Sequence, residues 1–132
     1  MAEETMVKEN LSEAVIEAGA KIVELLDKAK FSLSAAFWFY IPESNQWRLV
    51  FASPEVRIYG PKKSYRKVQS TLKKIDSSLI ALENIAVIDN IEPIIALLKV
   101  AIKTGPGISG IRFSRNTING TFIEDAYIYR MT

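Results

Sequence analysis

The sequence predicts an α+β fold from three observations. Apolar residues recur at helical spacing over 11–30 and again over 61–75. Two other segments, 31–53 and 111–130, each hold two β-prone runs separated by turn residues, as in a β-hairpin. A short apolar run and a third helical pattern precede the second hairpin. The predicted order is α-β-β-α-β-α-β-β, with one mixed or antiparallel sheet made of two hairpins and a central strand, and with the helices packed mainly on one face.

Length and composition indicate one domain. The chain has 132 residues, of which 48% are hydrophobic and 24% charged, ordinary values for a packed domain. We expect residues 1–132 to form a single α+β domain, with 1–9 as a loose N-terminal arm. The chain begins with acidic residues and has no run of about 18 apolar residues, so we expect a cytoplasmic protein without membrane association.

The sequence contains neither cysteine nor histidine. The lack of cysteine excludes disulfides, zinc–thiolate sites and thiol nucleophiles, and the lack of histidine excludes imidazole bases and ligands. Catalysis would have to use carboxylates, Lys, Tyr, Ser or Thr, or an oxygen-bound Mg²⁺. Because no catalytic motif is recognisable, we expect no enzyme activity and no cofactor.

Asn10 and Glu13 have the spacing of a capping box, which predicts a first helix that begins at Asn10 and runs over 11–30. Its apolar residues form one stripe at alternating steps of four and three. We expect the stripe to pack on the core, although the same heptad spacing also suits a helix pair across a dimer. The stripe consists of Leu11, Val15, Ala18, Ile22, Leu25 and Ala29.

Residues 31–53 predict a hairpin whose turn lies at 42–46. Pairing Ile41 with Trp47 divides the aromatic residues of the first strand between two faces. One face is then strongly apolar, with Phe37, Phe39, Ile41, Trp47, Leu49 and Phe51. The other face carries Trp38, Tyr40, Arg48 and Val50.

The segment after this hairpin predicts a connector and then a second helix. Residues 54–60 are expected to form the connector, with a short strand at 56–59. Gly60-Pro61 is a helix-entry signal, because proline suits the first helical turn. The second helix is expected to bury Tyr65, Val68, Leu72 and Ile75.

Residues 76–84 are expected to connect this helix to a short buried strand at 85–88. Asp89 or Asn90 then caps a third helix whose sequence leaves few polar positions. We expect this helix to be buried on most sides and to end at Gly105.

The last segment predicts a second hairpin around Asn119-Gly120, a strong signal for a type I′ turn. Its strands are 111–118 and 121–130. The expected register places Ile118 opposite Thr121 and Arg112 opposite Tyr127. One face then holds Ile111, Phe113, Phe122, Ala126 and Ile128, and the other holds Arg112, Ser114, Asn116, Asp125, Tyr127 and Tyr129.

Charge is distributed unevenly along the chain. Residues 61–75 carry six bases and no acid, whereas residues 1–27 carry seven acids and two bases. Six cations near one helix are able to contact several phosphates of a polyanion. The alternatives are a solvated helix face and a face covered by the acidic first helix. The candidate polyanion-binding residues are Lys62, Lys63, Arg66, Lys67, Lys73 and Lys74.

A second candidate site is an aromatic and basic sheet face. Tyr, Trp and Arg are favoured anchors of protein interfaces, and on an open sheet they also stack unpaired bases. The alternative is a half-solvated face stabilised by cross-strand pairs. The candidate interaction residues are Trp38, Tyr40, Arg48, Arg112, Asp125, Tyr127 and Tyr129.

Two further features of the sequence are weaker candidates. The glycine-rich segment 105–110 follows a helix and precedes a strand, the reverse of a phosphate loop, so it favours a simple connection. The acidic pairs Asp89/Glu92 and Glu124/Asp125 are the available Mg²⁺ ligands. The first pair fits helix capping better, and adjacent residues on a strand point to opposite faces.

Several short motifs resemble those of a group of small uncharacterised bacterial proteins, over residues 31–130. They are Phe37-Trp38, Trp47-Arg48-Leu49, Ala52-Ser53-Pro54, Gly60-Pro61 with Tyr65, and the run from Glu124 to Arg130. The resemblance implies no activity. The leading hypothesis is a non-catalytic protein-interaction or binding module, with an unknown protein partner or self-association. The alternative is a nucleic-acid-binding accessory protein that uses helix 62–74, and a Mg²⁺-dependent nuclease comes third.

Overall fold

The computed structural model describes residues 10–75 and 79–132, and within them it confirms the α+β class with a mixed five-stranded sheet. The predicted arm at 1–9 and residues 76–78 of the predicted connector lie outside the described residues. The strands are β1 (Ala35–Ile41), β2 (Gln46–Ala52), β3 (Ile85–Ile88), β4 (Ile111–Ile118) and β5 (Thr121–Met131). The helices are α1 (Glu13–Lys28), α2 (Glu55–Tyr59), α3 (Pro61–Leu72) and α4 (Pro93–Ala101), with a 3-10 turn η1 (Leu82–Asn84).

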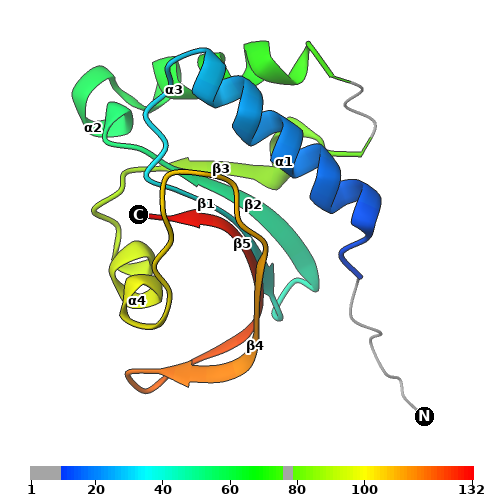
Figure 1. Cartoon of the computed structure of the whole chain (residues 1–132), viewed down its shortest axis with the longest axis vertical. Helices are drawn as coiled ribbons and strands as arrows, with labels where there is room; N and C mark the ends of the chain where they lie inside the picture. Colours follow the sequence, from blue (N-terminus) through cyan, green and yellow to red (C-terminus); the bar gives the residue numbers. More distant parts are fainter. Residues whose placement is uncertain (1–9, 76–78) are drawn as a thin grey trace.

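The sheet has the strand order β3-β2-β1-β5-β4. Every neighbouring pair is antiparallel except β2 and β3, which are parallel. The strand β3 comes between the two hairpins in the sequence, but in the sheet it forms one edge. The helices α1, α2 and α3 lie over one face, and α4 lies in the hollow of the other face (Figure 1). Each face thus has its own apolar core, and the inner strands are buried on both sides.

The register of the first hairpin differs from the prediction by one residue. Ile41 pairs with Gln46 rather than Trp47, because the turn occupies 42–45. Asn45 ends this turn with a φ of +52°, and its side-chain oxygen accepts a hydrogen bond from the Tyr40 hydroxyl. A slip of one residue exchanges the two faces of a strand. Trp38 and Tyr40 therefore share a face with Leu49 and Trp47, and this face lies in the core beneath α1 and α3.

The first helix packs on the core as expected, but its N-cap and its buried stripe differ. Ser12 caps α1 in place of Asn10, and its hydroxyl accepts a hydrogen bond from the Val15 amide at 3.2 Å. Ala29 is exposed at the C-cap. The fully buried residues of α1 are Gly19, Ile22, Val23 and Leu26.

Gly19 is required where α1 crosses the sheet. A Cβ atom at this position would collide with the hydroxyl of Tyr129, which lies directly beneath the helix. The close approach also explains why the buried stripe is rotated from the predicted one. A glycine carries no apolar side chain, so a pattern of apolar spacing does not count it as a core residue.

Three predictions in the middle of the chain are wrong. Residues 56–59 belong to the helix α2, not to a strand. The third predicted helix, which corresponds to α4, begins later than expected, because its N-cap is Glu92 and its first residue is Pro93. That helix is also less buried than predicted, since Val100 is 61% exposed.

The second hairpin forms as predicted at its turn. Asn119 and Gly120 have φ values of +48° and +81°, as a type I′ turn requires. Near the tip the faces change at Arg115, which adopts a φ of +43°, while the pairs on either side of it, Ser114–Asp125 and Asn116–Ile123, keep the same register. Phe122, expected on the apolar face, is 57% exposed, and Ile123 is buried in its place. This change of face packs the tip of the hairpin against the core below α4.

Candidate functional site

The predicted aromatic sheet face is mostly interior. Trp38 is 3% exposed, and its indole Nε1 donates to the Tyr129 hydroxyl at 2.9 Å. That hydroxyl donates in turn to the carbonyl of Ile16 in α1, at 2.6 Å. Burial raises the pKa of Tyr129 well above its ordinary value, so the group stays a neutral donor. Tyr40 lies in the same core, so Trp38, Tyr40 and Tyr129 are not exposed contact residues, contrary to the prediction.

Arg112 and Asp125 form a cross-strand ion pair. The guanidinium of Arg112 donates from Nε and Nη2 to the two carboxylate oxygens of Asp125, each at 2.7 Å, and this raises the pKa of Arg112. The Ser114 hydroxyl also donates to Asp125, which is 1% exposed. The arrangement is the cross-strand stabilisation weighed in the sequence analysis. Tyr127 is half-buried, and Arg48 is paired with Phe39 on the opposite sheet face, so the seven candidates do not share one surface.

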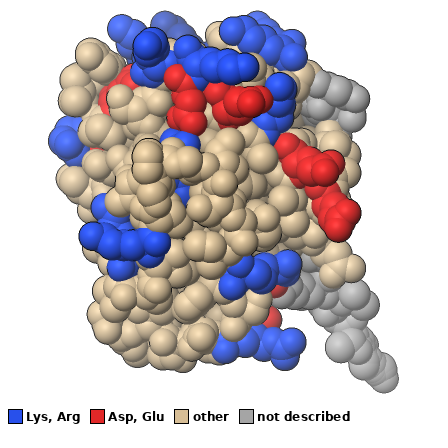
Figure 2. All heavy atoms as spheres, viewed as in Figure 1, with Lys and Arg blue, Asp and Glu red and all other residues tan. Residues whose placement is uncertain are grey.

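The basic residues of α3, in contrast, lie where the sequence predicted. Val68 and Leu72 face the core, and Gly60, with a φ of +93°, turns the chain into Pro61 at the first helical position. Figure 2 shows Lys and Arg side chains gathered along the upper edge of the molecule, where α3 lies in Figure 1. We call the exposed members the basic surface: Lys62, Lys63, Arg66, Lys73 and Lys74.

The acids of the first helix form no ion pair with the basic surface in the part of the chain that is described. On α1, Glu24 pairs with Lys21 of the same helix at 2.9 Å, and this hydrogen bond lowers the pKa of Glu24. Asp27 pairs instead with Arg130 of β5. Among residues 10–75 and 79–132, no ion pair joins an acid of α1 to a cation of α3.

Lys67, the sixth candidate, points into a cavity instead of outward. Its Nζ donates to Oε1 of Glu55 at 2.8 Å, and the backbone amide of Ser32 donates to Oε2 of Glu55 at the same distance. Burial alone would raise the pKa of Glu55, but the hydrogen bonds from Lys67 and Ser32 outweigh it and hold the pKa below its ordinary value. Glu55 is therefore ionised at neutral pH and fixes Lys67 in place.

The cavity has a volume of about 420 Å³ and lies between α2, the start of α3 and the loop after α1. Lys63 also borders it, with Nζ 5.1 Å from the centroid of the Tyr59 ring. Of its eight residues, sequence reasoning singled out only Lys63 and Lys67, because the loop after α1 and the segment 54–59 supply the other six. We call this site the lysine pocket; it is lined by Lys30, Ser32, Glu55, Tyr59, Lys63 and Lys67, with Pro54 and Ile58.

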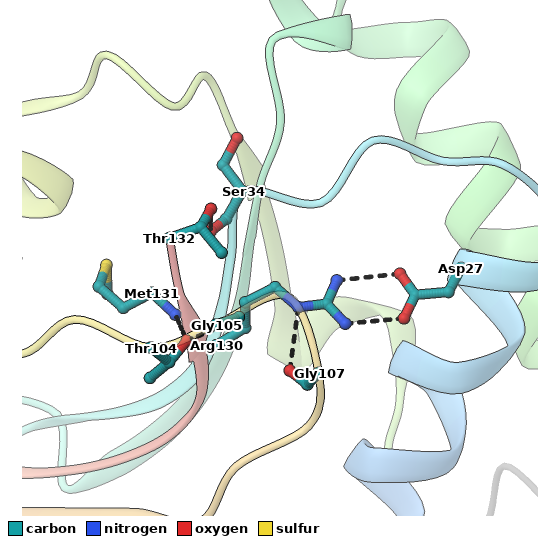
Figure 3. A network of polar contacts seen from close by, with 8 residues as sticks. All are labelled: Asp27, Ser34, Thr104, Gly105, Gly107, Arg130, Met131 and Thr132. Carbon is teal, nitrogen blue, oxygen red and sulfur yellow. Dashed lines mark hydrogen bonds and ion pairs between the residues drawn. The ribbon is translucent and has the colours of Figure 1, made fainter.

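Other candidate features have structural roles. The glycine-rich segment connects α4 to β4 and is tied to the end of β5. Arg130 donates to the Gly107 carbonyl at 3.2 Å and makes two hydrogen bonds to the Asp27 carboxylate (Figure 3). Thr104 is held in the same network, since its hydroxyl accepts from the Met131 amide at 2.8 Å (Figure 3). These bonds explain the segment as a connection.

The acidic pairs do not build a metal centre. Asp89 accepts hydrogen bonds from Arg57 and from the backbone amide of Ile91, which gives its carboxylate a role in the turn before α4. No group of three or more acids that could share a metal ion occurs among the described residues. None of the helices in those residues is long and apolar enough to cross a bilayer.

Comparison with known proteins does not place the chain in a family. A scan against protein-family models, a search of the curated proteins and a search of the solved structures each returned no match. The resemblance to small bacterial proteins stays a prediction. Function must therefore be argued from the chemistry of the sites.

Proposed function

We propose that this protein binds single-stranded nucleic acid through the basic surface of α3. The observation that carries the proposal is the absence, among the described residues, of any ion pair to Lys62, Lys63, Arg66, Lys73 or Lys74. Unpaired surface cations are available to replace the counterions of a phosphate backbone. The buried aromatic residues of the sheet give the protein-interaction hypothesis less support.

The dimensions of α3 suit several phosphate contacts. Its 12 residues correspond to a length of about 18 Å at 1.5 Å per residue. A strand in helical geometry places a phosphate about every 3.4 Å along its axis, so about five phosphates span the helix. That number is comparable to the five cations of the basic surface, of which three lie on these 12 residues and Lys73 and Lys74 follow directly.

An exposed aromatic ring beside the cations favours an unpaired strand over a duplex. Tyr59, at the end of α2, is 57% exposed and next to the start of α3. Bases of a single strand stack on such rings in proteins that bind it without sequence preference, whereas the bases of a duplex are already stacked. Ile58, also exposed, extends the apolar area around the ring.

A matched pair of variants tests the proposal by fluorescence anisotropy with a labelled single-stranded oligonucleotide. The first variant replaces Lys62, Arg66 and Lys73 with Gln. The control makes the same replacement at Lys99 on α4, Lys103 in the following loop and Arg115 on β4. Loss of three contacts should weaken binding about a hundredfold at 0.1 M salt, from about 0.7 released counterions per contact. Equal losses in both variants would contradict a site on α3.

A further inference from the structure

The lysine pocket has a net positive charge that comes only in part from residues of the basic surface. Lys30, Lys63 and Lys67 contribute three positive charges and Glu55 one negative charge, a net charge of +2. A phosphate monoester carries about −1.5 to −2 at pH 7, whereas a phosphodiester in a strand carries only −1. We propose that the lysine pocket binds a phosphate monoester, the group found at the end of a strand and on a free nucleotide.

The cations of the pocket come from separate elements that the fold holds together. Lys63 and Lys67 are one helical turn apart on the same side of α3. Lys30 reaches the pocket from the loop after α1, where its backbone has a φ of +63°. An open depression bordered by three lysines accommodates a terminal phosphate more readily than a phosphodiester, which has neighbours on both sides.

Glu55 positions Lys67 rather than repelling the ligand. One of its carboxylate oxygens accepts from Lys67 and the other from the Ser32 amide. The Nζ of Lys67 lies 5.7 Å from the centroid of the Phe31 ring, which supports it from a second direction. Lys67 therefore stays at the wall of the pocket when no ligand is bound, and less side-chain entropy is lost on binding.

The pocket has room for more than the phosphate. Its volume of about 420 Å³ is within the usual range of small-molecule sites. Tyr59 lines one side with an exposed ring, which gives the base or sugar attached to the phosphate an apolar surface. The ligand class that fits is a nucleoside monophosphate, either free or as the phosphorylated end of a strand. The strand-end form of this inference rests on the proposed function.

Calorimetric titration with AMP, adenosine and inorganic phosphate tests the pocket without a strand. AMP should bind, and adenosine, which lacks the phosphate, should bind at least tenfold more weakly. Lys63→Gln should weaken AMP binding about tenfold, from the loss of one charged hydrogen bond, and Lys63→Arg should largely restore it. The matched control Lys103→Gln, an exposed lysine in the loop after α4 that belongs to neither the pocket nor the basic surface, should leave AMP binding unchanged. AMP that binds no better than adenosine, or that ignores Lys63→Gln, would overturn the proposal.

Oligonucleotides of one sequence that differ only in their end groups identify the source of the monoester, and the 5′- and 3′-phosphorylated forms among them are equal in charge. A strand with a 5′-phosphate is compared with the same strand carrying a 3′-phosphate and with one that has hydroxyl groups at both ends. Tighter binding of a phosphorylated end that depends on Lys63 supports a strand end as the ligand, and AMP binding without that preference supports a free nucleotide. Strand binding with no response to AMP or end phosphate would refute the pocket but keep the basic surface. AMP binding without strand binding would keep the pocket and refute the proposed function.

Discussion

Replacing Tyr129 with Phe removes one hydroxyl from the interface between α1 and the sheet. This hydroxyl accepts from the Trp38 indole at 2.9 Å and donates to the Ile16 carbonyl at 2.6 Å. The carbonyl keeps the amide partner that helical geometry supplies four residues later, but the buried indole N–H is left without an acceptor. An unsatisfied buried donor costs about 1 to 3 kcal/mol, so we expect a loss of about 2 kcal/mol in the free energy of unfolding.

Urea denaturation followed by tryptophan fluorescence measures this loss, which corresponds to a fall of about 8 °C in Tm at about 4 °C per kcal/mol. The matched control is Tyr127→Phe, because Tyr127 packs edge-on against Tyr129 with ring centroids 5.4 Å apart yet is only half-buried. We expect the control to change the free energy of unfolding by less than about 0.5 kcal/mol. If the two substitutions cost the same, the buried hydrogen-bond relay is not what fixes α1 on the sheet.

Three further substitutions test other parts of the structure by the same denaturation assay. Gly19→Ala should destabilise the protein by about 1 to 2 kcal/mol, despite the better helix propensity of Ala. The loss should be smaller when Tyr129 is also replaced with Phe, because the Tyr129 hydroxyl is the group with which the new Cβ atom collides. Lys67→Met should lower the free energy of unfolding by about 1 to 2 kcal/mol at pH 7. Because the pKa of Glu55 is lowered in the fold, this difference between wild type and variant should disappear as the pH falls below 4.5 and Glu55 becomes protonated. A difference that does not change with pH would contradict the pairing. Asp27→Ala should cost about 2 to 3 kcal/mol, since it leaves a guanidinium that is 5% exposed without its carboxylate, and a loss under 0.5 kcal/mol would contradict that role.

The elements of the fold were largely predictable because they depend on local signals. The Asn119-Gly120 turn, the apolar run of β3 and the stripe of α3 each have a short-range physical cause, and the structure contains all of them. The register of the first hairpin was not predictable in the same way. Both faces of β1 are buried, so apolar residues occupy odd and even positions alike and the pattern does not select one register.

The basic surface and the lysine pocket also differ in how far local sequence signals predict them. The basic surface lies on α3 and the two residues after it, so the periodicity of one helix was enough to predict that this face is exposed, although the same pattern also placed Lys67 on it. The lysine pocket combines Lys30, Glu55 and Tyr59 with α3, and these residues meet only because the end of α1 and all of α2 pack beside it. Glu55, the one acid between Pro54 and the basic run, was the only sequence signal, and a buried partner for a lysine is not visible from spacing alone.

The salt dependence of single-strand binding is the most direct test of phosphate binding by the basic surface. Five phosphate contacts predict that log Kobs falls with log salt concentration at a slope of about −3.5, at about −0.7 per contact. The variant with Gln at 62, 66 and 73 should reduce the slope to about −1.4, whereas the control at 99, 103 and 115 should keep the original value. Absence of binding at low salt, or a slope that the α3 substitutions leave unchanged, would contradict a phosphate-binding role for the basic surface.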